Sequence, residues 1–125
     1  MIKRALIIKK EWLDRIFDCR IFDGRKTWEM RSTKTNVRGK IGLIEARSGL
    51  IVGEADLVGC GKRLTEQTAA DNFKFHRVSD LSKLKYWCYP WILENAIRYE
   101  KPIPYNHPLG AVIWVNINES IFESK

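Results

Sequence analysis

Three charged residues that could carry out chemistry lie close together in segment 23–32, which reads DGRKTWEMRS. Lys26 follows a glycine turn, where its ammonium could contact a phosphate or, with a lowered pKa, act as a nucleophile or a base. Glu29 and Arg31 are two residues apart on a predicted strand, so their side chains share one face. Glu29 could be a general base, and Arg31 could bind a phosphate or a base edge.

A structural role is the alternative for each of these residues. A lysine beside a glycine turn is commonly a solvated surface residue, and Glu29 with Arg31 could form an ion pair that closes one end of a barrel. Glu54, on a later predicted strand, either joins a cleft or stays exposed on the barrel wall. The residues alone leave these alternatives open.

Hydrophobic spacing divides the chain into short strands and a few helices. Alternating or continuous apolar runs predict strands, and apolar stripes at helical spacing predict helices. The expected strands are 5–10, 27–32, 40–46, 50–60 and 111–117, and the expected helices are 11–24, 64–76 and 79–87.

Several of these segments carry more specific expectations. The short turn RSG between 40–46 and 50–60 predicts a hairpin. Segment 111–117 is apolar almost throughout and is expected to be a central strand. Segment 89–96 could be strand or helix, and the proline-rich segment 101–110 is expected to be an extended loop.

The lengths and the order of these elements predict the fold class. Short strands with few helices, and no alternation of strands and helices, favour an α+β fold built on a small barrel of five to six strands with helices packed around it. Within the helix expected at 64–76, Thr65 is a suitable N-cap. The length of 125 residues predicts a single domain over residues 1–125.

The net charge of +7 is concentrated in one part of the chain. Residues 1–47 hold 13 Lys or Arg and 6 Asp or Glu, whereas residues 48–125 hold nine of each. Such an excess indicates an anionic partner, with nucleic acid first and a nucleotide or acidic lipid next, unless the lysines serve solubility alone.

Composition also predicts which classes of protein to set aside. No apolar run approaches the roughly 20 residues of a membrane span, and the N-terminus lacks a secretory signal, so a cytoplasmic protein is expected. Cys19, Cys60 and Cys88 do not show metal-ligand spacing with His76 and His107, which predicts no metal site. The absence of phosphate-loop and dinucleotide motifs predicts no cofactor.

Aromatic residues make up 11% of the chain and could offer faces on which a base stacks. Tyr86, Tyr89 and Tyr105 are the preferred candidates because they lie beside polar or loop segments. His107 lies on a loop and could titrate near neutral pH. Trp114 is expected in the core, while His76 is expected to cap the end of a helix.

Taken together, these segments resemble the ASCH domain, the activating-signal-cointegrator homology family of PUA-like barrels. Gly24, Lys26, Glu29 and Arg31 match the family signature G-x-K-x-x-E-x-R at every fixed position. The later strands and the proline-rich approach to the last one follow the family order, so the resemblance covers nearly the whole chain. It implies a barrel with a cleft into which the signature residues point.

The resemblance also implies activities. The family is associated with RNA binding, and small bacterial members resemble either ribonucleases or amidohydrolases that remove an acyl group from the N4 amine of cytidine. Lys26, Thr27 and Arg31 fit the pattern G-x-K-T-x-T-x-R of the amidohydrolases, whereas Glu29 replaces a threonine. Their catalytic acid falls near segment 64–72, which offers Glu66 or Asp71.

We therefore predict an RNA- or nucleotide-binding domain with a basic cleft, which could also cut RNA without a metal. The alternatives are an amidohydrolase acting on N4-acylated cytidine nucleosides and an adaptor that binds a protein through its neutral C-terminal half. The expected partner is single-stranded RNA or a nucleotide or nucleoside, not a membrane. The predicted catalytic residues are Lys26 and Glu29, and the predicted substrate- or RNA-binding residues are Gly24, Arg25, Thr27, Arg31, Tyr89, Tyr105 and His107.

Overall fold

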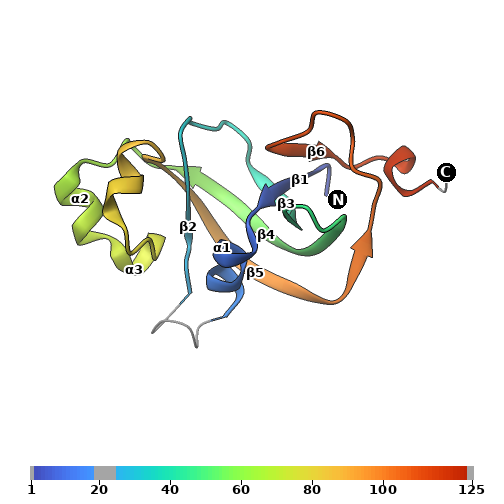
Figure 1. Ribbon diagram of the computed structural model, residues 1–125, viewed down its shortest axis with the longest axis horizontal. Helices are drawn as coiled ribbons and strands as arrows, with labels where there is room; N and C mark the ends of the chain where they lie inside the picture. The colour runs from blue at the N-terminus through green and yellow to red at the C-terminus, as the bar shows by residue number, and fades with distance from the viewer. Residues whose placement is uncertain (1, 19–24, 124–125) are drawn as a thin grey trace.

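The computed structural model describes residues 2–18 and 25–123 and is built on one curled sheet (Figure 1). Its strands are β1 (Arg4–Ile8), β2 (Trp28–Arg31), β3 (Gly39–Glu45), β4 (Leu50–Cys60), β5 (Tyr89–Pro104) and β6 (Trp114–Asn116). Their order across the sheet is β2-β5-β4-β3-β1-β6, with β1 and β3 parallel and every other neighbouring pair antiparallel. The sheet forms a half-barrel with β2 and β6 at its edges.

Short helices cover parts of this sheet. They are α1 (Lys10–Phe17), α2 (Glu66–Asp71) and α3 (Phe73–His76), with the 3-10 turns η1 (Leu81–Lys85) and η2 (Glu119–Phe122). Figure 1 shows α2 and α3 beside one end of the sheet, and β6 with the C-terminal segment at the other. The arrangement confirms the predicted α+β, PUA-like fold.

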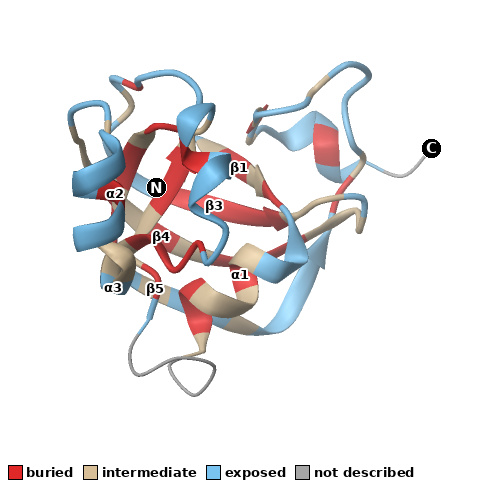
Figure 2. Ribbon diagram, turned by 60° about the vertical axis from the view of Figure 1, so that its left-hand side comes forward, coloured by how far each residue is buried: buried red, intermediate tan, exposed pale blue. Residues whose placement is uncertain are grey.

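The main hydrophobic core lies where α1 packs against the curled sheet. Leu13, Ile16 and Phe17 of α1 are buried against Leu43 of β3 and Leu57 of β4. Figure 2 shows the buried residues gathered on the strands, while the outer surface of α2 is exposed. Burial of this apolar stripe, rather than intrinsic helix propensity, stabilises so short a helix.

Several predicted elements are confirmed. β3 and β4 form the expected hairpin. Segment 89–96, for which strand and helix were both open, is a strand within β5. Thr65 caps α2, since its hydroxyl accepts from the Thr68 backbone N–H and the Thr68 hydroxyl accepts from the Thr65 N–H. The helix expected at 64–76 is divided at Asn72 into α2 and α3, and part of the helix expected at 11–24 lies outside the described residues.

The expectation of a central strand at 111–117 was wrong. Only Trp114–Asn116 forms a strand, and it lies at the edge of the sheet beside β1. Gly110 has a φ of +82° and Val112 is 76% exposed, so the chain joins the sheet only at Ile113, whose carbonyl accepts from the Ile7 N–H. Apolar composition alone did not distinguish a buried strand from an exposed connection.

The boundaries of two other segments also differ from expectation. The strand expected at 5–10 ends at Ile8, because α1 already begins at Lys10. Residues 105–110 of the expected loop lie outside any strand, but β5 continues to Pro104, so residues 101–104 are strand. Proline is tolerated there because β2 pairs only with Tyr89–Ile92, which leaves the later part of β5 with one unpaired side. No helix in the described part of the chain has the length and hydropathy that a membrane crossing requires.

Replacing Gly53 with alanine is expected to lower the stability of the fold. The new Cβ would lie 2.6 Å from Cζ of Phe17 and would also press against the carbonyl oxygen of Ile97. Overpacking of this kind costs about 1–3 kcal/mol. Gly59→Ala is the matched control, since its Cβ would meet only Ile92 Cδ1, at 3.5 Å. Thermal unfolding followed by circular dichroism should show a lower midpoint for Gly53→Ala alone, and equal midpoints would contradict the packing.

Candidate functional site

The charged residues of the signature lie where the curled sheet is not closed by strand pairing. No backbone pairing joins β2 to β1 in the described residues, although these strands come together at this position. The side chain of Arg31 connects them, since its Nη2 donates a hydrogen bond of 2.8 Å to the Ile7 carbonyl oxygen. Arg31 therefore joins two strands at an opening in the half-barrel wall.

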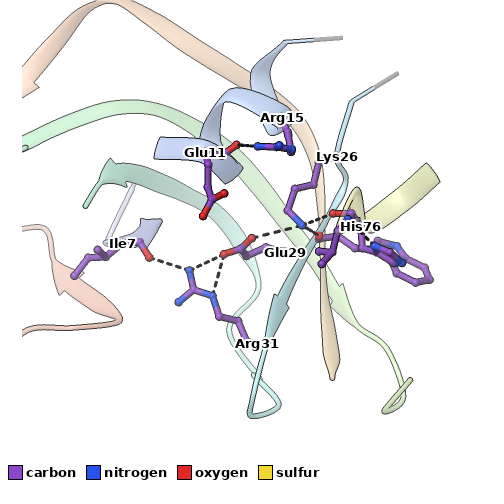
Figure 3. A network of polar contacts seen from close by, with 9 residues as sticks. Ile7, Glu11, Arg15, Lys26, Glu29, Arg31 and His76 are labelled. Carbon is purple, nitrogen blue, oxygen red and sulfur yellow. Dashed lines mark hydrogen bonds and ion pairs between the residues drawn. The ribbon is translucent and has the colours of Figure 1, made fainter. Parts of the chain in front are cut away.

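Lys26 is held inside this opening by its main chain and its side chain. The Lys26 backbone N–H donates to the Arg15 carbonyl at 2.8 Å. Its Nζ donates to the carbonyl oxygens of Trp28 and His76, both at 2.6 Å, and lies 3.8 Å from Glu29 Oε1 (Figure 3). Because the residue is only 2% exposed, it is not a solvated turn lysine.

Burial lowers the pKa of Lys26 to about 8. The carboxylate of Glu29 raises the pKa, while the nearby cations of Arg31 and Arg15 lower it further. A neutral amine has two N–H donors and one lone pair, so the two carbonyl acceptors can satisfy both donors. The lone pair would then occupy the fourth tetrahedral direction around Nζ. The surroundings of Lys26 therefore suit both the ammonium and the amine near physiological pH.

Glu29 and Arg31 form a two-point ion pair. Glu29 Oε2 accepts from Arg31 Nε at 3.1 Å and from Nη2 at 2.8 Å (Figure 3). Glu29 is 4% exposed, whereas the side chain of Arg31 is 18% exposed and lies over the ring of Trp91 at 5.5 Å. Nη1 of Arg31 donates to no acceptor among the described residues, and Oε1 of Glu29 has only the longer contact of 3.8 Å with Lys26 Nζ, so both can still bond to a ligand.

These three residues line a cavity of about 250 Å³. Its remaining wall is mainly apolar and aromatic. Trp12 of α1 lies on one part of it, with its ring 5.2 Å from Lys26 Nζ, and Trp87 lies on another. The complete lining is Ile7, Lys9, Trp12, Lys26, Glu29, Met30, Arg31, Ala46, Val78, Leu84, Trp87 and Val112.

Comparison with known proteins identifies the family. The profile of the ASCH domain matches residues 6–103, which is most of the chain. The chain belongs to the ASCH domain family. The curated proteins contain no match to it.

Solved structures from one organism share the fold of this ASCH domain. The crystal structure of ASCH from Zymomonas mobilis has a TM-score of 0.64 at 14% identity, over 93% of this chain and 87% of that one. A tyrosine-to-phenylalanine variant of that protein gives a TM-score of 0.66 at 14% identity, over 96% and 93% of the two chains. At this identity the similarity establishes the fold and transfers no activity.

Three predicted binding residues of the ASCH domain, Arg25, Thr27 and Tyr89, do not line the cavity. Arg25 is exposed, and its Nη1 donates to the Ala96 carbonyl at 3.1 Å. Thr27 contributes main-chain bonds, donating to Phe75 and accepting from Leu93. Tyr89 lies below the ammonium of Lys34. Gly24 falls outside the described residues.

Tyr105 and His107 stabilise a loop instead of forming the cavity wall. The Tyr105 hydroxyl is 2.7 Å from His107 Nδ1, and His107 Nε2 is 2.8 Å from the Ala111 carbonyl. With Nε2 as the donor to that carbonyl, Nδ1 accepts from the Tyr105 hydroxyl. These bonds connect the two ends of the loop that precedes Val112, so their geometry supports a structural role.

His76 is buried and hydrogen-bonded through both ring nitrogens, so it does more than cap a helix. It ends α3, as expected, but it is fully buried, and burial lowers its pKa. Its Nδ1 accepts from the Val78 backbone N–H at 2.9 Å, so its Nε2, 2.7 Å from the Ala69 carbonyl, is the donor. The ring is thus neutral and fixes the carbonyl group that receives Lys26.

Glu29 is the one carboxylate that lines the cavity among the described residues. Glu54 pairs with Lys40 at 2.9 Å on the wall of the sheet. Glu66 is exposed at the start of α2, and Asp71 accepts from Gln67 in the same helix. Within residues 2–18 and 25–123, no three His, Cys, Asp or Glu side chains gather as metal ligands do.

The sequence does not single out the aromatic wall. Trp12 begins the apolar stripe of the helix expected at 11–24, and Trp87 is one of four tryptophans that could equally offer a face for base stacking. A usable signal was present for Trp12, because it begins the stripe beside two basic residues, Lys9 and Lys10. No pattern in the sequence around Trp87 indicates that this residue lines the same cavity as Trp12.

Proposed function

We propose that this ASCH domain binds a single nucleobase in the Lys26 cavity, presented by a nucleoside, a nucleotide or single-stranded RNA. The observation that carries the proposal is the combination of hydrogen-bonding groups with aromatic walls. Lys26 and Arg31 offer donors and Glu29 offers an acceptor. Trp12 and Trp87 offer apolar faces. An unstacked base is recognised by this combination of stacking and edge hydrogen bonds.

The size and polarity of the cavity favour a base over a phosphate at its inner end. A volume of about 250 Å³ lies just below the roughly 300–1,000 Å³ of typical small-molecule sites, so it suits one ring system and not a folded strand. The Glu29 carboxylate would repel a phosphate placed beside it. Lys9, which is exposed on the cavity lining, could contact a 5′-phosphate that remains outside.

Isothermal titration calorimetry with a panel of nucleosides and with short single-stranded RNA tests this proposal. We expect saturable binding of at least one nucleoside, with one base preferred, because the edge contacts discriminate among donor and acceptor patterns. RNA that presents the same base should bind at the same site and compete with the nucleoside. Binding of RNA without any nucleoside competition would contradict a base-binding cavity.

Hydrolysis of an amide on the exocyclic amine of cytosine is a second candidate function. The lowered pKa of Lys26 favours it, because a general base is most effective when its pKa is near the working pH. Neutral Lys26 would take a proton from water as the hydroxide adds to the acyl carbon. The resulting ammonium would return a proton to the amine as the carbon–nitrogen bond breaks, which releases a carboxylic acid and free cytosine amine. Arg31 Nη1 could stabilise the oxyanion.

Cleavage of RNA is less well supported by the geometry. A metal-free reaction would use Glu29 or Lys26 as the base for the 2′-hydroxyl, with Arg31 stabilising the phosphorane. The Glu29 carboxylate is one of the proposed bases and lies beside the other, so it would repel the phosphodiester that has to approach them. Incubation with N4-acetylcytidine and, separately, with RNA in the presence of a chelator distinguishes the two reactions: we expect acetate release and no shortened RNA.

The rate of acetate release should depend on the protonation of Lys26. Because the amine is the active form, we expect the rate to rise with pH and to level off above about pH 8. Initial rates between pH 6 and 10, at saturating substrate, measure this profile. A rate that falls through the same range would indicate that the ammonium is required, and would contradict the general-base role.

The free energy of unfolding should also depend on the protonation of Lys26. The pKa of Lys26 is lower in the folded protein, at about 8, than its ordinary value of 10.5, so the unfolded chain binds the proton more tightly. The free energy of unfolding should therefore increase with pH between about 8 and 10. Urea unfolding of the wild-type protein and of Lys26→Met across this range isolates the contribution, because the variant should lack the increase.

A further inference from the structure

The parallel pairing of β1 and β3 separates two regions of the molecule. The register runs from Ala5 beside Gly42 to Ile8 beside Glu45, so both strands begin at one end of the sheet and finish at the other. Lys9 directly follows β1 and Ala46 directly follows β3, and both residues line the Lys26 cavity. β3 has seven residues, which places the beginnings of the strands about 20 Å from that cavity.

A second, larger groove lies at the beginnings of these strands. Its volume is about 570 Å³, more than twice that of the Lys26 cavity. Four of its seven lining residues are basic, and none is acidic. They are Lys3, Arg4, Asn36, Val37, Arg38, Gly39 and Lys40. We name these seven residues the basic groove.

Three of the four cations in the basic groove are not neutralised by carboxylates. Lys40 pairs with Glu54 at 2.9 Å and with Asp56 at 3.5 Å, so its charge is largely offset. Within residues 2–18 and 25–123, no ion pair involves Lys3, Arg4 or Arg38. The groove thus keeps a local excess of positive charge, whereas Glu29 offsets part of the charge in the Lys26 cavity.

The two guanidinium groups of the basic groove are already positioned. Arg38 Nη1 donates to the carbonyl oxygens of Thr35 at 3.0 Å and Val37 at 2.7 Å, and these bonds leave its charge unpaired. Arg4 lies over the ring of Trp114, 6.0 Å from the centroid. A guanidinium that is held in place loses less conformational entropy when it binds an anion, and its planar fork matches phosphate oxygens.

We propose that the basic groove binds phosphate groups, independently of the Lys26 cavity. Fixed guanidinium groups, a flexible ammonium and the side-chain amide of Asn36 supply the donors that phosphate oxygens accept. The ligand is a chain of phosphates, either the backbone of a single-stranded nucleic acid or an inorganic polyphosphate. Both sources present the same chemistry to Lys3, Arg4 and Arg38.

A double variant, Lys3→Gln with Arg38→Gln, tests the proposal. Fluorescence anisotropy with a labelled eight-residue oligouridine, at several salt concentrations, should show weaker binding by the variant. Each lost phosphate contact reduces the salt slope by about 0.7, so the loss of two should reduce it by about 1.4. The matched control is Lys62→Gln with Lys101→Gln, which removes two exposed charges elsewhere and should bind like the wild type. An equal loss of oligouridine affinity in both double variants would overturn the proposal.

Two further experiments distinguish the two ligand sources from each other and the two binding sites from each other. Tripolyphosphate should displace the oligonucleotide, and tighter binding of tripolyphosphate than of oligouridine would assign the groove to free polyphosphate. Failure of tripolyphosphate to compete would overturn phosphate recognition. Lys26→Met should retain tripolyphosphate binding, because that ligand carries no base, while the Lys3/Arg38 double variant should retain nucleoside binding in the cavity. A loss of tripolyphosphate binding in Lys26→Met, measured where that variant is folded, would contradict independent sites.

Discussion

Lys26→Met is expected to abolish nucleoside binding and to lower the stability of the folded protein. Methionine fills much of the space of lysine but donates no hydrogen bond, so the carbonyls of Trp28 and His76 would be left buried and unpaired. Each unsatisfied buried group costs about 1–3 kcal/mol, which predicts a total loss of about 2–6 kcal/mol. Urea unfolding measures the stability, and calorimetry at low temperature measures binding by the folded fraction.

The exposed Lys62 provides the control for this change. Lys62→Met alters the charge in the same way on the surface, where substitutions usually fall within about 0.5 kcal/mol. A Lys26→Met protein that is destabilised but binds nucleosides at the wild-type affinity would show that Lys26 has only a structural role. A variant that is as stable as the wild type would contradict the hydrogen bonds of the buried ammonium.

Glu29→Gln is expected to weaken nucleoside binding at least tenfold with a smaller loss of stability. The amide keeps the shape of the carboxylate and one acceptor for Arg31, but it loses the negative charge that strengthens a hydrogen bond from a base. A hydrogen bond to a charged group contributes about 1.5–3 kcal/mol, and a tenfold change in affinity corresponds to about 1.4 kcal/mol. Titration calorimetry at constant pH measures the difference.

Glu54→Gln is the matched control for Glu29→Gln. Glu54 also accepts from a cation and from a second donor, Lys40 and the Tyr99 hydroxyl, but it lies outside the cavity. We expect the Glu54 variant to bind nucleosides like the wild type. If Glu29→Gln does the same and only lowers the melting temperature, the ion pair with Arg31 is a structural connection between β2 and β1.

Local patterns predicted much of the sheet and part of the site. Alternation placed Glu29 and Arg31 on one strand face, and their two-point ion pair is present. The turn between β3 and β4 and the capping residue Thr65 were also predicted, because hairpin and cap geometry depend on residues close in sequence. The position of β6 was not predicted, since an exposed apolar connection and a buried strand have similar composition.

The environment of Lys26 could not be predicted from its neighbours. One of its two acceptors is the carbonyl of His76, fifty residues further along the chain. A carbonyl acceptor leaves no trace in the amino-acid sequence, because every residue has one. The family signature identified Lys26 as important, but its burial and its lowered pKa depend on how α3 packs beside β2.

The charge of the first 47 residues also required the fold for its interpretation. The sequence favoured one basic cleft around Lys26. In the structure, Lys26 and Arg31 lie at the finishing ends of β1 and β3, whereas Lys3, Arg4 and Arg38 lie where these strands begin. Residues from one basic segment are therefore divided between two regions, since the parallel pairing of β1 with β3 is a long-range feature.

The central claim is that the Lys26 cavity binds a nucleobase between its polar and aromatic walls. Nuclear magnetic resonance of the indole N–H groups tests it most directly, because five tryptophans are distributed over the chain and each can be assigned by a single Trp→Phe substitution. On titration with the preferred nucleoside, we predict the largest shifts at Trp12 and Trp87, which line the cavity, and a small shift at Trp114, which does not. Unchanged resonances of Trp12 and Trp87 at saturating nucleoside would contradict the account.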